Sequence, residues 1–480
     1  MPEDAPVEIG KNHVFSSGRS STRYFKDGYF DYNFEKFLGL ATYSGAEIAE
    51  CFETAARITD GDPESWIQAW TSTARRVEAY AENAMKGGHT VSAREAWLRA
   101  TTYYQAAFFF VPDKDPRKAE LYWKHTGCFQ SAGKLFDPPF EPLAIPYDDG
   151  GKKKTLFGYF LRCDDKSSRR RPTVLIQMGA DGSSEQIYFS GGGAAALRRG
   201  YNALIFEGPG QTGTFMRDRS LTYRHDWEVP VAAVVDYALT RPEVDPQRIA
   251  LIAYSMGGYF GPRAVAFEKR IAACIASGLV PSMLALAGSR IAAIRNVKDG
   301  QYNHAARYAL FEHMPKYGLD HDVQDLDKLE AIWEKFQLYG LEDQITCPLL
   351  VVQAAAEGEH QTRLARDFFD KLPNPKNVFR LTTEDDAAEM HCQKGNAMLL
   401  HAIEFDWLDD VLGSHDPGHP QEQIPHYQPI SARDSAHPKP GMSVRAWTSY
   451  MMTTLKILLN QLRRTYREGW AIYAEHAPVM

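Results

Sequence analysis

The sequence has few cysteines, and none of them are grouped. Six occur in 480 residues, each alone: Cys51, Cys128, Cys163, Cys274, Cys347 and Cys392. A zinc site or a disulfide framework needs cysteines, or cysteines and histidines, at short regular spacings, and no such spacing occurs. We therefore expect no metal and no cofactor, and a protein that works in a reducing compartment such as the cytoplasm.

Long hydrophobic runs and an excess of positive charge are also missing. The longest apolar stretch, Ala106 to Val111, is far shorter than the roughly 20 residues that span a bilayer. The first ten residues are acidic and polar, unlike a signal peptide. Lys and Arg number 54 against 61 Asp and Glu, and the net charge of −7 argues against nucleic acid as the main partner. We expect no membrane span and no nucleic-acid partner.

Residues 1–137 are typical of a helical domain. Asp62-Pro63 and Asp115-Pro116 each combine an N-cap residue with proline in the first helical turn. Ser92 and Glu95 match a capping box ahead of another helix. Large aromatic side chains are concentrated here, which indicates packing inside this domain or against a neighbouring one: Trp66, Trp70, Trp97, Tyr103, Tyr104, Phe108 and Trp123.

Beyond Asp137-Pro138-Pro139, short runs rich in β-forming residues alternate with helical stretches. The later runs are apolar throughout, as in strands covered on both faces, and the helices between them complete βαβ units. We therefore predict an α/β domain over residues 138–412 with a mostly parallel eight-stranded sheet. The expected strands are Leu143–Tyr147, Thr155–Leu161, Thr173–Gln177, Ala203–Phe206, Ile249–Tyr254, Ala273–Ala276, Leu349–Gln353 and Val378–Leu381.

Two segments do not follow this alternation. Residues from about 279 to 340 lack strand signals, and we expect them to form a helical lid. Residues 413–480 begin as an arm rich in Pro and His and end in an amphipathic helix, about Ser443 to Glu475. Its apolar stripe fits docking on the body of the protein or on a dimer partner, and its basic residues also allow a membrane-surface interpretation.

The hexapeptide from Ala253 to Gly258 predicts a nucleophile. A serine on the sharp turn from a strand to a helix needs small residues two positions away on each side, and Ala253 and Gly257 flank Ser255 in this way. An apolar strand precedes the turn, and a helix rich in small residues follows it. The alternative is an ordinary strand-to-helix turn.

In chains with such a serine, the acid and then the histidine follow it in sequence. His391 follows the last expected strand, whereas His401 lies inside a helix and His415 and His419 lie in the arm. The acid should follow the strand Leu349–Gln353, where both Glu357 and Glu359 are available. Either carboxylate could orient the imidazole and stabilise its charged form.

Two backbone N–H groups are expected to form an oxyanion hole. One belongs to Met256, directly after the serine, and the other to the loop Gly179–Gly182, where Ala180 is the expected donor. Gly191–Gly193 is a rival glycine cluster. It is no phosphate-binding loop, because the GK[ST] ending is missing.

Four stretches together resemble one branch of the α/β-hydrolases: Phe206 to Gln211, Asp226 to Glu228, Ser255 to Tyr259 with Pro262 and Arg263, and His391 to Gln393. That branch includes 2,6-dihydroxypseudooxynicotine hydrolase and the fungal hydrolases that shorten polyketide chains in pigment biosynthesis. The resemblance extends from about Trp66 to Leu412. It implies a metal-free Ser-acid-His enzyme, a site between the helical domain and the sheet, and often a homodimer.

We therefore expect a serine hydrolase that cleaves a C–C bond next to a ketone, or an ester bond, in an aromatic or polyketide-like acyl substrate. Ser255, His391 and Glu357, or Glu359 in its place, would carry the reaction. An acyltransferase or cyclase with the same residues is the alternative. A binding module that only keeps the hydrolase shell is a third possibility, against which the order of Ser, acid and His argues.

Overall fold

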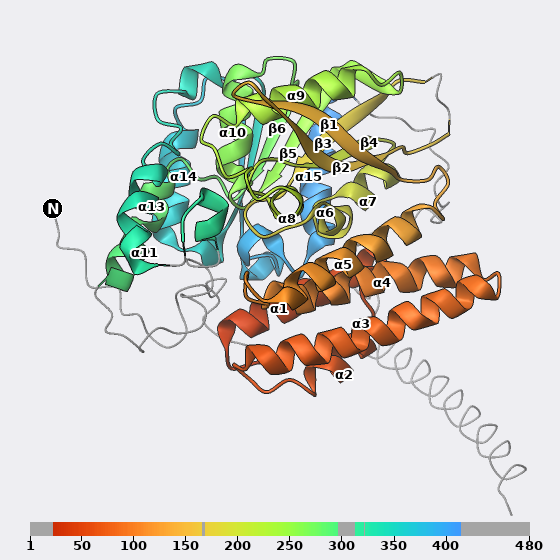
Figure 1. Cartoon of the computed structure of the whole chain (residues 1–480). Helices are drawn as coiled ribbons and strands as arrows, with labels where there is room; N and C mark the ends of the chain where they lie inside the picture. Colours follow the sequence, from red (N-terminus) through yellow and green to blue (C-terminus); the bar gives the residue numbers. More distant parts are fainter. Residues whose placement is uncertain (1–22, 166–168, 296–312, 321, 414–480) are drawn as a thin grey trace, which may run out of the picture. The chain divides into compact units, whose positions relative to one another are not determined.

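The structure, a computed structural model, describes residues 23–165, 169–295, 313–320 and 322–413 (Figure 1). In this part of the chain, helices precede the first strand: α1 (Gly28–Gly39), the 3-10 turn η1 (Leu40–Tyr43), α2 (Ile48–Ala55), α3 (Pro63–Lys86), α4 (Thr90–Phe109) and α5 (Pro116–Gly133). All described residues belong to one compact unit of the chain. We call α1 to α5, with η1, the helical segment.

The predicted Asp-Pro helix starts are confirmed. The Asp62 side chain accepts a hydrogen bond from the Glu64 N–H, and Asp115 does the same for the Arg117 N–H. The predicted capping box at Ser92 is wrong, because α4 already begins at Thr90. The Gly87-Gly88 turn reverses the chain so tightly that the new helix starts before Ser92 is reached.

The eight expected strands are all present and form one sheet. They are β1 (Glu141–Asp149), β2 (Lys152–Leu161), β3 (Arg171–Gln177), β4 (Asn202–Glu207), β5 (Val244–Tyr254), β6 (Ala273–Ser277), β7 (Leu349–Ala354) and β8 (Val378–Thr382). Their order is β1-β2-β4-β3-β5-β6-β7-β8. Both pairings of β2 are antiparallel and the others are parallel, so the prediction of a mostly parallel sheet is confirmed.

Helices cover both faces of the sheet. They are α6 (Ser184–Ser190), α7 (Gly193–Arg198), α8 (Thr212–Arg217), α9 (Glu228–Leu239), α10 (Gly257–Phe267), α14 (Glu359–Phe369) and α15 (Ala397–Leu412). Alternate side chains of β3 enter two different cores: Ile176 packs with α6, α15 and the helical segment, whereas Leu175 packs with α9 and α10. The sheet and the helical segment therefore share one apolar core.

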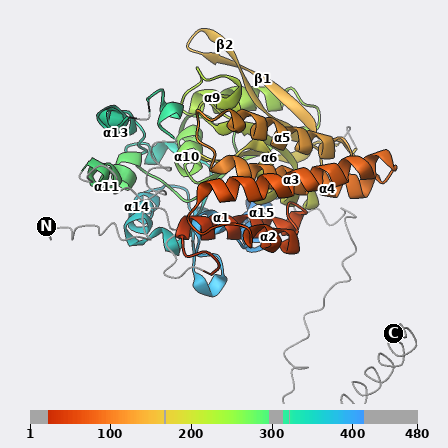
Figure 2. The ribbon, with the colours of Figure 1, turned by 60° about the horizontal axis from the view of Figure 1, so that its bottom comes forward.

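Hydrogen bonds also join the helical segment to the sheet domain. The Tyr43 hydroxyl lies 2.8 Å from His401 Nδ1. His125 Nε2 lies 2.7 Å from Ser183 Oγ and 3.2 Å from Glu185 Oε2. Figure 2 shows α1 to α5 grouped on the side of α6 and α15. The division of the chain at 137/138 and 412/413 stays a prediction.

The described part of residues 279–340 contains α11 (Met283–Arg295), two 3-10 turns, η2 (Met314–Tyr317) and η3 (Val323–Asp325), and α13 (Leu326–Trp333). His360 Nε2, on α14, lies 3.1 Å from the Ala285 carbonyl, which ties this insertion to the sheet domain. Its predicted action as a lid stays a prediction. The predicted C-terminal helix and arm lie outside the described residues, and so do His415 and His419.

Gly158 tests how closely β2 and β4 approach. A Cβ at this position would lie 2.0 Å from the Ile205 carbonyl oxygen and 2.9 Å from Phe206 Cα, and neither backbone atom can turn aside. We expect Gly158→Ala to lower the free energy of unfolding by about 1–3 kcal/mol or more, measured by urea denaturation.

Gly127→Ala is the matched control. Gly127 lies on the exposed side of α5, where an added Cβ meets no atom within 4 Å, so alanine should be neutral or slightly stabilising in this helix. An equally stable Gly158→Ala protein would contradict the packing described for β2 and β4.

Candidate active site

Ser255 lies on a strained turn between β5 and α10. Its φ of 60° is in the left-handed region, which non-glycine residues rarely adopt. The Ser255 N–H donates to the Ser277 carbonyl at 2.9 Å, and the Ser255 carbonyl accepts from the Gly258 N–H at 2.7 Å. A Cβ at Gly258 would lie 1.8 Å from the Gly278 carbonyl oxygen. The expected sharp turn from strand to helix is therefore confirmed, and glycine is required for its close packing.

A chain of hydrogen bonds joins the three residues that the sequence singled out. Ser255 Oγ lies 2.9 Å from His391 Nε2, and His391 Nδ1 is bonded to Glu357 Oε1 on the other side of the ring. A carboxylate can only accept a hydrogen bond, so we assign the proton to Nδ1, which leaves Nε2 of the neutral ring to accept the Ser255 hydroxyl. The Glu357 side chain is 4% exposed and that of His391 is 33% exposed.

The two candidate acids lie in different places. Glu357 ends a 3-10 turn, η5 (Ala355–Glu357), directly after β7, and its second oxygen accepts a hydrogen bond from the Gln353 side-chain amide. The other end of that amide accepts from the Leu279 N–H at 3.2 Å. Glu359 begins α14 and is exposed. The structure therefore brings Glu357, and not Glu359, to His391.

The His391 segment is fixed to two strands of the sheet, β6 and β8. Gln393 accepts a hydrogen bond from the Ser277 hydroxyl at 3.0 Å and donates one to Thr382 Oγ1 at 3.0 Å. Cys392 and Gln393 both have positive φ values, 54° and 50°. The last residues of β6 and β8 thus hold the segment in a conformation that its residue types do not favour.

Cys392 is a site residue that the sequence did not identify. Its Sγ lies 3.5 Å from His391 Nε2, the atom that also faces Ser255. Burial disfavours the charged imidazolium, but the negative charges of Cys392 and Glu357 outweigh this effect, so the pKa of His391 lies well above its usual value. A lone cysteine next to a histidine in the sequence carries no signal of this contact, which depends on the left-handed backbone.

The loop after β3 packs directly on the Ser255 turn. A Cβ at Gly179 would lie 2.5 Å from the Met256 nitrogen and 2.7 Å from Ser255 Cβ. In the part of the chain that the structure describes, the N–H groups of Met256 and Ala180 have no hydrogen-bond partner. Neither N–H group is therefore engaged by a described residue, and Gly179, the neighbour of Ala180, packs against Ser255; their role as oxyanion donors stays a prediction. The rival cluster, Gly191–Gly193, instead forms the turn between α6 and α7.

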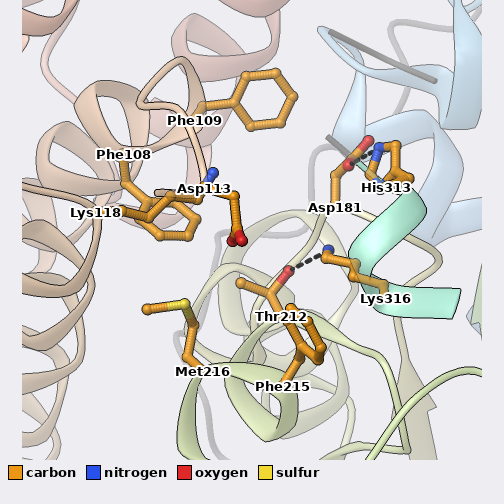
Figure 3. Close-up of a pocket in the computed structure, with 10 residues that line it drawn as sticks. All are labelled: Phe108, Phe109, Asp113, Lys118, Asp181, Thr212, Phe215, Met216, His313 and Lys316. Atoms are coloured by element: carbon orange, nitrogen blue, oxygen red, sulfur yellow. Dashed lines mark hydrogen bonds and ion pairs between the residues drawn. The ribbon is translucent and has the colours of Figure 1, made fainter. Parts of the chain in front are cut away.

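A cavity of about 40 Å³ adjoins this loop. Its walls come from the helical segment, the loop after β3, α8 and η2: Phe108, Phe109, Asp113, Lys118, Asp181, Thr212, Phe215, Met216, His313 and Lys316. Figure 3 shows Asp181 paired with His313, at 2.7 Å, and Lys316 reaching Thr212, at 3.3 Å. Lys316 also donates to the Ala180 carbonyl at 2.5 Å, and so fixes the loop that carries an expected oxyanion donor.

The described residues contain neither a metal-binding cluster nor a helix that could span a membrane. No group of three or more His, Cys, Asp or Glu side chains there could hold a metal ion. No helix among the described residues is both long enough and apolar enough to cross a bilayer.

The chain is similar to known proteins over most of its length. A hydrolase of Pyricularia oryzae is 30% identical over 424 residues, which cover 82% of this chain and 99% of the relative. The 20-hydroxy-prefusarin hydrolase of Gibberella moniliformis is 30% identical over 413 residues, which cover 81% and 97%. The crystal structure of 2,6-dihydroxy-pseudo-oxynicotine hydrolase shares the fold, with a TM-score of 0.62, 22% identity, and coverage of 80% of this chain and 98% of that one.

The family likeness expected from the sequence motifs is confirmed by these relatives. The model of the alpha/beta hydrolase family matches residues 182–429, which include Ser255, Glu357 and His391. The chain belongs to the alpha/beta hydrolase family, and it is a hydrolase.

Proposed function

We propose that this hydrolase uses Ser255 as its nucleophile, His391 as the general base and acid, and Glu357 as the acid that orients His391. The observation that carries the proposal is the hydrogen-bond chain from Glu357 through His391 to Ser255. Each link has the direction that nucleophile activation needs, since the carboxylate fixes the tautomer that leaves Nε2 free to take the serine proton.

The reaction proceeds in two halves. Ser255 Oγ attacks the substrate carbonyl while His391 takes its proton, and the N–H groups of Met256 and Ala180 stabilise the oxyanion. His391 then protonates the leaving carbon or oxygen, which leaves an acyl-enzyme. Water, activated by His391, hydrolyses the acyl-enzyme and restores Ser255.

The substrate class that we propose is an aromatic or polyketide-like acyl compound, cleaved at a C–C bond next to a ketone or at an ester. A relative of 30% identity is named for hydrolysis of 20-hydroxy-prefusarin, and it is matched over 97% of its length. The aromatic walls of the cavity, Phe108, Phe109 and Phe215, suit an apolar acyl chain.

Ser255→Ala tests the nucleophile. We expect the protein to fold normally, to lose labelling by a fluorophosphonate probe, and to hydrolyse a 4-nitrophenyl ester roughly 10³-fold or more slowly. Ser92→Ala, within α4, is the control and should behave as wild type. Near-normal turnover by a folded Ser255→Ala protein would refute the mechanism.

Paired amide substitutions test the acid. Glu357→Gln removes the charge that stabilises the imidazolium and should lower kcat by roughly 10²- to 10⁴-fold, whereas the exposed Glu359→Gln should have little effect. Measurement of kcat for both variants decides between them. The reverse ranking would assign the role to Glu359.

Cys392→Ala tests the electrostatics of His391. Catalysis needs the neutral imidazole, so activity falls as the pH drops through the pKa of His391, which Cys392 helps to raise. Removal of the sulfur lowers that pKa, so the acid limb of the kcat/KM profile should move to lower pH. The buried Cys163→Ala, distant in the sheet domain, should leave the limb in place. An unmoved limb in Cys392→Ala would show that Cys392 does not set this pKa.

A further inference from the structure

Helix α1 lies along the segment that carries the catalytic histidine. At one end, the Tyr32 hydroxyl donates to the His391 carbonyl at 3.4 Å. At the other end, a Cβ at Gly39 would lie 3.0 Å from Gly395 Cα, so the two backbones touch. Lys36 is one helical turn after Tyr32 on the same side of α1. It therefore lies between these two contacts, opposite the residues that follow His391.

Lys36 is a buried cation without a carboxylate partner. It is 5% exposed, and its Nζ lies 4.5 Å from the ring centroid of Phe109 and 4.9 Å from that of Phe37. Among the described residues, no carboxylate lies within ion-pair distance of it. Aromatic rings offset only a small part of the cost of removing an ammonium group from water.

A second buried ammonium comes from the histidine segment itself. Lys394 is 6% exposed, and within the described chain its Nζ has no hydrogen-bond partner. It lies 5.5 Å from the ring centroid of Tyr254, the residue before Ser255. Burial, and next the charge of Lys394, lower the pKa of Lys36 to about 7, so about half of Lys36 is neutral at pH 7 unless a negative charge stabilises its ammonium form.

The nearby carboxylates are engaged elsewhere. Asp181 is paired with His313, and Glu357 is bonded to His391 and to Gln353. Glu404 accepts from the Tyr254 hydroxyl at 2.8 Å, and burial raises its pKa to about 8, so it is mostly neutral at pH 7. Neither buried amine therefore has a carboxylate partner among the described side chains, and the one negative charge that acts on both, that of Cys392, is shared with His391. A bound anion would supply a counter-charge.

We propose that Lys36 and Lys394 form a subsite for a negatively charged oxygen, a carboxylate or an enolate, on the acyl substrate that Ser255 attacks. The inference rests on the proposed function and narrows its substrate class to acidic acyl compounds. Lys36 comes from the helical segment, so that segment would select the substrate as well as enclose it.

The test compares mono-4-nitrophenyl esters of succinate, glutarate and adipate with neutral 4-nitrophenyl esters of the same acyl length. Wild-type protein should show a higher kcat/KM for at least one anionic ester than for its neutral counterpart. In Lys36→Gln and Lys394→Gln that preference should fall roughly 10- to 100-fold, the effect of losing a hydrogen bond to a charged group. Lys86→Gln, at the exposed end of α3, is the control and should keep the preference.

The possible outcomes separate this inference from the proposed function. No preference in wild type, or an unchanged preference in both folded lysine variants, would overturn the subsite. If the variants do not fold, calorimetry on the wild type compares binding of monomethyl adipate with methyl hexanoate, and equal affinities would overturn it too. Absence of fluorophosphonate labelling at Ser255 would count against the proposed function, while the binding comparison still decides the subsite.

Discussion

The left-handed backbone of Ser255 is the constraint around which the rest of the site is arranged. Hydrogen bonds to Ser277 and Gly258 hold that conformation. It also requires glycine at positions 179 and 258, because a Cβ at either position would collide with neighbouring backbone. The strain is tolerated because β5 lies between β3 and β6 in the middle of the sheet, where packing leaves no alternative path. Gly179 likewise allows the loop after β3 to pack closely on the backbone of Met256.

Much of the fold could be predicted because its signals are local. Short runs rich in β-forming residues indicated every strand, and small residues on each side of Ser255 indicated the turn. The choice between Glu357 and Glu359 could not be made, because it depends on the side chain of Gln353 and on where α14 begins. The Ser92 capping box failed for a similar reason, since the preceding glycine turn set the start of α4. Local rules fail where a contact distant in sequence, or a backbone reversal, decides the geometry.

The contact between α1 and the His391 segment is the clearest case of such a distant constraint. Tyr32 and His391 are 359 positions apart, and no pattern in either stretch predicts their hydrogen bond. The interface depends on shape, because Gly39 and Gly395 allow the two backbones to touch, and on a shared apolar core between the sheet and the helical segment. Because the aromatic helices are buried against the sheet, polar side chains of α1 such as Tyr32 come to lie beside the His391 segment.

Electrostatics then distinguishes the carboxylates that surround this centre. Glu357 is bonded to the imidazole of His391. The positive charges of His313 and Lys316 lower the pKa of Asp181 and keep it ionised. Burial raises the pKa of Glu404 and keeps it mostly neutral. A carboxylate in such surroundings adopts the charge that its neighbours stabilise, so neither distance nor residue type alone identifies a counter-ion. Among the described side chains, Lys36 and Lys394 have no carboxylate partner, and the negative charge of Cys392 that acts on both is shared with His391. In the proposed subsite, the carboxylate or enolate of an acidic substrate would supply the missing counter-charge.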